Sequence, residues 1–174
     1  MWRGLTNAQI LAWNKLALSQ EAKSILGTKG KISGANLFTR LNYRIVACGG
    51  SPVTTPPTLV GVETPSACTI VCTASAFTFQ LASVPTDFTD LRLVIEATKG
   101  QSNGVSRAYS KAAEIKLVAT PSATAVDIKS DYEAKNGVLG ADAPKVFSRY
   151  YYVNEVTGEK SGVMLADAIG TSGE

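Results

Sequence analysis

Histidine is absent from this chain of 174 residues. Its absence excludes Ser-His-Asp and Cys-His catalytic arrangements and most zinc sites, because each of them needs an imidazole. Cysteine is scarce, and the only three are Cys48, Cys68 and Cys72. The last two lie four residues apart in a predicted strand, which separates them by about 13 Å along it. A disulfide needs Cα atoms within about 7 Å, so we expect three small buried thiols and neither a disulfide nor a metal site.

Long apolar runs are also missing from the sequence. No stretch reaches the ~18 residues that a membrane-spanning helix requires. Polar side chains, beginning with Arg3 and Asn7, interrupt the N-terminal segment, so we predict no signal peptide and no membrane partner. The composition still supplies a core, since 45% of the residues are hydrophobic and 18% are charged. We expect one folded domain, or a domain with an appendage.

Both tryptophans of the chain, Trp2 and Trp13, lie near its first predicted helix. Thr6 is a favourable N-cap residue, and Gln9 three residues later completes a capping box. Apolar residues then recur at helical spacing as far as residue 18. The sequence therefore predicts a helix over residues 7–18.

A second helix is predicted to begin at Ser33. Leu37, Leu41 and Ile45 recur at positions i, i+4 and i+8, which places them on one face. The glycine pair at 49–50 is expected to end this helix.

The segment between the two helices carries weaker signals. Ser19 is expected to cap a short helical turn over residues 20–26. Segment 27–34 contains three glycines, but their spacing matches neither of the phosphate-binding glycine motifs. We predict a loop there.

Residues 1–50 are too few to bury the apolar stripe of their helices among themselves. The stripe must therefore meet another surface, which is either the rest of this chain or another subunit. The residues that we predict to make this contact are Trp2, Trp13, Leu37, Phe38 and Leu41.

Residues 51–57, SPVTTPP, are interpreted as a linker because the two adjacent prolines favour an extended backbone. The pattern then changes to short stretches rich in β-branched and aromatic residues. In one of them the alternation predicts that Leu91, Leu93 and Ile95 face one way and that Arg92, Val94 and Glu96 face the other. Strands are expected at 58–64, 67–74, 77–83, 90–98 and 114–120, with a hairpin over 145–162 that turns across 155–158.

Residues 127–135 fit either a strand or a short helix. Six or seven short strands at this spacing predict a β-sandwich over residues 58–174.

Three segments carry a more specific signal. They are W-x-x-L-T-x-A-Q-x-x-A-W at 2–13, S-G-x-N-L-F-x-x-L-N at 33–42 and V-N-x-x-T-G-E-x-S at 153–161. Together with the Pro-rich linker, they resemble a family of phage and prophage proteins associated with bacteria of the Bacteroides and Flavobacterium kind. Members look like virion structural proteins whose β domain is similar to fibronectin type III or immunoglobulin-like modules. The resemblance implies a mainly β fold: such an antiparallel sandwich after a short two-helix segment, with no catalytic residues.

Charge is distributed unevenly along the chain. Residues 1–48 hold seven Lys or Arg against one acidic residue, a net charge of +6, whereas residues 49–174 carry a net charge of −3. A basic segment fits a solvated face, docking on an acidic protein surface, or nucleic-acid contact. The lysines are scattered and no aromatic platform lies among them, which disfavours nucleic acid.

Three classes of function remain, and we expect the first. It is a structural component of a phage virion, a capsid-associated decoration or minor capsid protein anchored by its N-terminal helices and made in the host cytoplasm. Its partners would be other virion proteins or further copies of the chain.

The alternative is a tail- or fibre-associated module that binds a host glycan or receptor. The tyrosines at 150–152 are candidates for stacking on such a ligand. Alternation along a strand, however, turns at least one of them into the core. An enzyme is not expected, because the carboxylate pairs Asp127/Asp131 and Glu155/Glu159 suggest no acid–base geometry. We assign no catalytic, cofactor-binding or metal-ligating residues.

Overall fold

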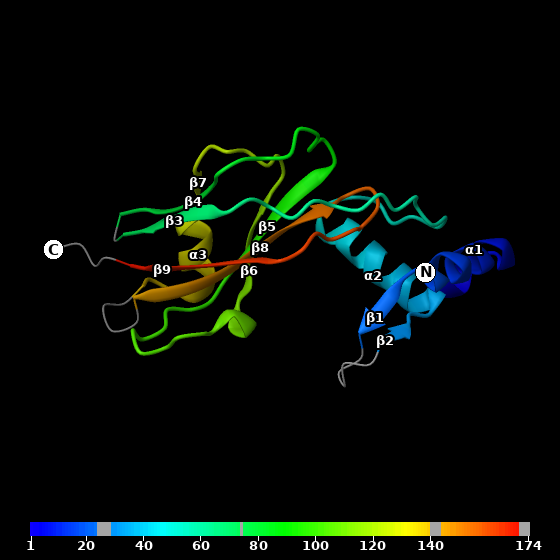
Figure 1. Ribbon diagram of the computed structural model, residues 1–174, viewed down its shortest axis with the longest axis horizontal. Coiled ribbons are helices and arrows are strands. Elements are labelled where there is room, and N and C mark those ends of the chain that lie inside the picture. The colour runs from blue at the N-terminus through cyan, green and yellow to red at the C-terminus, as the bar shows by residue number, and fades with distance from the viewer. Residues whose placement is uncertain (24–28, 74, 140–143, 171–174) are drawn as a thin grey trace. The chain divides into compact units, whose positions relative to one another are not determined.

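The computed structural model divides the chain into two compact units, whose elements are labelled in Figure 1. Unit 1 comprises Met1–Val60 together with Asn154–Glu159, and unit 2 comprises Gly61–Val153 with Lys160–Glu174. Each unit has its own cluster of buried apolar side chains and therefore its own core. The structure describes residues 1–23, 29–73, 75–139 and 144–170.

Unit 1 is mainly helical. Its described elements are η1 (Trp2–Gly4), α1 (Asn7–Leu18), β1 (Glu21–Lys23), β2 (Lys29–Lys31) and α2 (Gly34–Ala47). None of the helices in the described part of the chain is both long enough and apolar enough to cross a membrane. The bounds predicted for α1 are confirmed, and α2 begins at Gly34, one residue after its predicted start at Ser33.

Local hydrogen bonds explain why both helices begin where they do. The Thr6 side chain accepts from the Gln9 backbone N–H (3.3 Å), and the Gln9 side chain accepts from the Thr6 N–H (2.9 Å), which confirms the capping box. Ser33 caps α2 by accepting from the Asn36 N–H (3.2 Å). These caps satisfy N–H groups that have no partner within the helix.

The predicted helical turn at 20–26 is wrong in its described part. Ser19 does not start a new turn, because its hydroxyl donates back to the Leu16 carbonyl (2.7 Å) at the end of α1. The chain continues into β1, which pairs antiparallel with β2. β2 lies within the segment predicted as a loop, and residues 24–28 are outside the described residues.

The segment predicted as a linker packs as part of unit 1. The first part of unit 1 extends to Val60, three residues beyond the predicted end of the linker. Val53 and Leu59 both pack against the helical cluster. Leu59 falls in the strand predicted at 58–64, and that prediction is wrong because no residue of this stretch is in a strand.

Unit 2 contains two antiparallel sheets. One has the strand order β3-β4-β7 and the other the order β6-β5-β8-β9 (Figure 1). The strands are β3 (Cys68–Cys72), β4 (Phe77–Leu81), β5 (Leu91–Ala97), β6 (Ala113–Val118), β7 (Val126–Asp127), β8 (Lys145–Asn154) and β9 (Met164–Ile169). The short helices η2 (Tyr109–Lys111) and α3 (Lys129–Asn136) lie between strands in the sequence.

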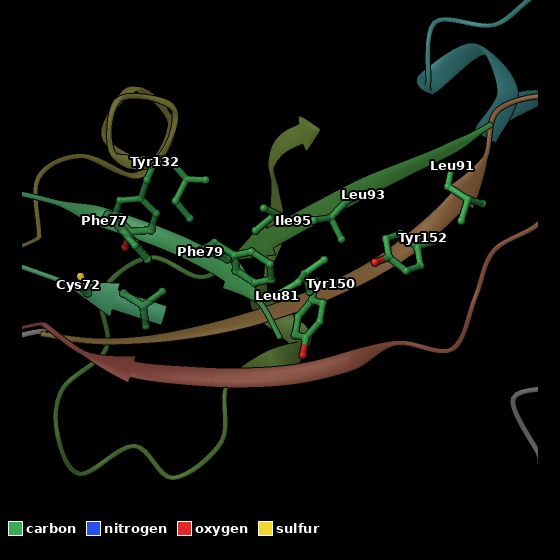
Figure 2. Packing of buried hydrophobic residues seen from close by; sticks show 13 residues of the cluster. Cys72, Phe77, Phe79, Leu81, Leu91, Leu93, Ile95, Tyr132, Tyr150 and Tyr152 are labelled. Carbon is green, nitrogen blue, oxygen red and sulfur yellow. The ribbon is translucent and has the colours of Figure 1, made fainter. Parts of the chain in front are cut away.

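The core of unit 2 draws side chains from both sheets, as Figure 2 shows. Phe79 of β4 meets Tyr150 of β8 edge to face at 5.0 Å, and Phe77 packs on Tyr132 of α3 at 4.9 Å. The shared face predicted for Leu91, Leu93 and Ile95 of β5 is confirmed, since all three belong to this cluster. Mixing of both sheets in one cluster makes unit 2 a sandwich.

The remaining strand predictions have mixed outcomes. β3, β4, β5 and β6 lie within or nearly within their predicted ranges. Most of segment 127–135 belongs to the short helix α3, which ends at Asn136. The predicted hairpin turn is present, but its second strand, β9, lies beyond the predicted end at residue 162. All three cysteines are free thiols.

Candidate functional site

The residues predicted to make assembly contacts gather in the core of unit 1. The side chains of Trp13 and Leu37 have no exposed surface, and Phe38 and Leu41 are almost as deeply buried. Trp2 is half-buried and packs on the same cluster. The prediction that residues 1–50 could not bury this stripe among themselves is wrong, because α1 and α2 bury it mainly against each other and, of the described residues, only Val53 and Leu59 join from outside that range.

Aromatic packing organises this cluster. The ring of Phe38 lies 5.3 Å from Trp13 in a T-shaped arrangement and 5.4 Å from Trp2 in a tilted one. Such pairs contribute about 0.5–1.5 kcal/mol beyond their buried area. The Trp13 indole N–H donates to the Thr54 carbonyl (2.8 Å), which satisfies its one polar group and fixes the former linker segment on α1.

A buried asparagine fixes the same segment on α2. The Asn42 side chain accepts from the Val53 N–H (2.6 Å) and donates to the Val53 carbonyl (3.1 Å) and the Phe38 carbonyl (3.1 Å). The Asn42 amide thereby pairs with both the N–H and the carbonyl of Val53, as the backbone of a neighbouring β-strand would. The segment after α2 is held by hydrogen bonds and is not a free connection.

The turn that follows β8 also belongs to unit 1. Gly158 is buried against the backbone of Leu41, and a Cβ atom there would lie 2.8 Å from the Leu41 Cα. The Arg44 side chain donates to the Gly158 carbonyl (3.3 Å). The Glu159 carboxylate accepts from the Val60 N–H (3.1 Å).

The turn is internally ordered by its own side chains. The Asn154 Oδ1 atom accepts from the N–H groups of Val156 (2.9 Å) and Thr157 (2.8 Å). The Thr157 hydroxyl donates to the Glu159 carboxylate (3.1 Å). Residues of the V-N-x-x-T-G-E-x-S segment therefore shape a turn that fits α2.

Unit 1 retains apolar side chains on its exposed surface. Leu11 and Leu18 of α1 are 71% and 62% exposed, and Tyr43 of α2 is 74% exposed. Beside α1 an open groove of about 560 Å³ is lined by Ala12, Lys15, Leu16, Ser19, Gln20, Pro56, Pro57, Thr58 and Leu59. These exposed residues are not among the predicted contacts. The signal that could have identified them is that the leucines of α1 are distributed over more than one face of the helix.

A polar cluster occupies the outer face of the four-stranded sheet in unit 2. Glu96 of β5 forms an ion pair with Arg149 of β8 and accepts from the Tyr151 hydroxyl (2.9 Å). Burial, and then the charge of Glu96, raise the pKa of Tyr151 above its usual value. The Lys160 ammonium lies 3.3 Å from the centre of the Tyr151 ring.

An aromatic pair lies beside this cluster on the same face. Tyr109 packs edge to face on Phe147 at 5.0 Å, and its hydroxyl donates to Asp167 (3.2 Å). Asp167 also pairs with Lys145 at 3.5 Å. Burial, and then Asp167, raise the pKa of Tyr109, while the charge of Arg107 opposes them.

The predicted alternation of the three adjacent tyrosines is confirmed. Tyr150 and Tyr152 belong to the core, and Tyr151 faces outward. Tyr150 donates to the Ser66 carbonyl (3.0 Å), so its hydroxyl is used within the fold.

The carboxylate pairs considered for catalysis make structural contacts. Asp131 binds Lys116 at 2.7 Å, and Asp127 accepts from the Lys129 N–H (2.9 Å) at the start of α3. In the described residues no group of three or more His, Cys, Asp or Glu side chains could hold a metal ion.

Comparison with family models, curated proteins and solved structures returns no match for this chain.

Proposed function

We propose that this chain is a structural component of a phage virion, a capsid-associated decoration or minor capsid protein anchored by its helical unit. The observation that supports the proposal is where the three sequence segments that resemble phage proteins lie in the structure. Residues from all three meet in unit 1, where Trp13, Asn42 and Gly158 each join parts distant in sequence. Residues that carry the resemblance are therefore not scattered over the fold. They meet in one small unit, where their contacts join distant parts of the chain.

The β domain is proposed to be a fibronectin type III-like sandwich. Its first, second and fifth strands share one sheet, and its fourth, third, sixth and seventh strands form the other. Relative to the constant-type immunoglobulin arrangement, the fourth strand has moved to the edge of the second sheet. This order supports the fold that the resemblance implies.

The anchor is proposed to act through the exposed face of unit 1. The buried residues among those predicted as assembly contacts are proposed to contribute to the anchor only indirectly, because they hold α1 and α2 together. They are Trp13, Leu37, Phe38 and Leu41. Leu11 and Leu18 lie seven residues apart on α1, on one side of the helix, with Lys15 between them. An apolar strip with a central cation fits a partner surface that is apolar with an acidic side chain.

The test is incorporation into particles of the phage that encodes the chain. Quantitative mass spectrometry of gradient-purified capsids, separated from tails, is expected to find the chain at a fixed ratio to the major capsid protein. Its absence from purified particles would contradict the proposal.

Charge variants of the exposed strip sharpen this test. The double variant Leu11→Lys and Leu18→Lys is expected to fold and to be depleted from capsids, because burying two added cations is unfavourable. Val138→Lys is the matched control, since Val138 of unit 2 is 79% exposed. Equal incorporation of both variants would show that this strip is not the anchor.

The tail or fibre module is the second candidate, and the capsid–tail separation decides between them. Recovery of the chain in the tail fraction favours it. Nucleic-acid binding would instead appear as affinity that falls steeply with salt, with a log–log slope near −0.9 per neutralised phosphate.

A further inference from the structure

An open groove crosses the outer face of β8 and β9 in unit 2. Its volume is about 550 Å³, within the range of about 300–1,000 Å³ that small-ligand sites occupy. Arg149 and Leu165 are direct cross-strand neighbours in it, and the segment before β6 supplies the opposite wall. The lining residues are Arg107, Tyr109, Ser110, Arg149, Val163 and Leu165.

Arg149 retains an unused hydrogen-bond donor in this groove. Its Nε and Nη2 atoms bind Glu96, and Nη2 also donates to the Ala112 carbonyl (3.3 Å). Nη1 has no acceptor in the described residues, and it is not among the polar atoms sealed from solvent. The ion pair with Glu96 therefore fixes the guanidinium plane and leaves one edge available to a ligand.

Arg107 supplies a second cation. Its side chain is exposed, and it forms no ion pair with any residue that the structure describes. Two guanidinium groups in one groove, each with unused donors, are suited to a carboxylate or a similar oxyanion.

The charge of the groove favours a single negative charge on the ligand. Three cations and two carboxylates line the groove or form the ion pairs beside it, so their net charge is +1. These residues are Arg107, Arg149, Lys145, Glu96 and Asp167. Glu114 and Lys160, the next charges around Tyr151, have opposite signs. A carboxylate matches this excess, whereas a dianionic phosphate would face two carboxylates with incomplete compensation.

The walls of the groove suit a sugar ring. Tyr109 is held in place by its contact with Phe147 and its hydrogen bond to Asp167, so its ring is a fixed surface. Val163 and Leu165 are more than 40% exposed and add apolar area. Apolar walls with a few fixed polar groups match a ring that has C–H faces and a hydroxyl edge.

We propose that this groove binds a carboxylate-bearing sugar, with the carboxylate on Arg107 and Nη1 of Arg149 and one ring face on Tyr109 and Leu165. The site lies wholly within unit 2 and does not depend on how the chain is anchored in a particle.

Three related monosaccharides test the ligand class on the full-length protein. Glucuronic acid carries a carboxylate at the carbon where glucose has a hydroxymethyl group and glucose 6-phosphate has a phosphate ester. In NMR titrations, glucuronic acid is expected to bind in the millimolar range and to shift backbone signals at 107–110, Arg149 and Leu165. Glucose is expected to bind at least about tenfold more weakly, because it lacks the charge-assisted hydrogen bonds.

Variants then assign the contacts. Arg107→Gln is expected to weaken glucuronic acid binding about tenfold. Arg149→Lys keeps a charge beside Glu96 but removes Nη1, and is expected to weaken binding as well. Lys99→Gln, an exposed cation of the same unit outside the lining, is the matched control and should bind like the original chain.

Four results would overturn the proposal. They are no binding at tens of millimolar glucuronic acid, equal binding of glucose, preference for glucose 6-phosphate, and shifts confined to residues outside the groove. Unchanged melting of each variant verifies that a loss of binding does not reflect unfolding. None of these outcomes bears on incorporation into capsids, so this proposal and the virion proposal fail separately.

Discussion

Gly158 shows how strongly a single residue can depend on its surroundings. It has a φ of +71°, a left-handed conformation that glycine adopts readily. It is also buried against the Leu41 backbone, so there is no room for a side chain. Gly137 has a similar φ of +81°, but nothing lies within 4 Å of the position of its missing Cβ.

This pair separates backbone strain from close packing. Gly137→Ala is expected to cost about 1–3 kcal/mol from backbone strain alone, because its φ of 81° with a ψ of 173° is a conformation that essentially only glycine adopts. Gly158→Ala should cost about 1–3 kcal/mol more, because the turn must move away from α2. Urea denaturation of both variants measures the difference, and equal losses would show that the turn does not pack on α2 as described.

At the scale of elements, α2 is the hub of unit 1. One of its faces contacts α1, Asn42 holds the segment after the helix, and Arg44 binds the turn at 154–159. The helix thus connects three parts of the chain through side chains that all lie between Leu37 and Arg44.

Asn42→Ala should detach the segment that follows α2. Its loss leaves the Val53 N–H and carbonyl without partners, at an expected cost of about 2–3 kcal/mol. Hydrogen exchange of the Val53 amide should become faster. Thr39→Ala removes an exposed side-chain hydrogen bond on the same helix and should change stability by less than about 0.5 kcal/mol. An unchanged exchange rate at Val53 would contradict this role.

The helices were predictable because their signals are local. Thr6, Gln9 and Ser33 act within one turn of their own position, so pattern and structure agree. The strand predicted at 58–64 failed because Leu59 packs on the helices and Val60 binds Glu159, 99 residues away. Local pattern contains no information about that partner.

Other features depend on the assembled fold. Strand β9 alternates, but its inward positions include two alanines, which give a weak hydrophobic signal. The groove of unit 2 joins residues near position 108 to residues 149 and 165. Single arginines at such separations are indistinguishable from other exposed cations until the sheet brings them together.

At the scale of the whole molecule, buried tyrosines link stability to alkaline pH. Burial, followed by the charge of Cys72, raises the pKa of Tyr132 to about 12, and burial likewise raises the pKa of Tyr150. An unfolded tyrosine ionises near pH 10. Above that pH the unfolded state releases protons first, so the free energy of unfolding must fall.

We expect stability to be independent of these tyrosines below about pH 10 and to decline as the pH rises towards about 12. Urea denaturation at a series of pH values measures the slope. Tyr132→Phe should make the decline shallower, although it also removes the hydrogen bond to the Thr98 carbonyl (3.0 Å) and so lowers stability throughout. A steeper decline in this variant would contradict the assignment.

The membership of residues 154–159 in unit 1 has a consequence for synthesis of the chain. The hydrogen bond between Arg44 and Gly158 spans 114 residues. Both helices leave the ribosome long before the turn that completes their packing, and such long-range closure is slow. During that interval the backbone of Leu41, later covered by Gly158, remains open to water and to neighbouring nascent chains. The helical unit can therefore complete its packing only after residues 154–159 have been translated.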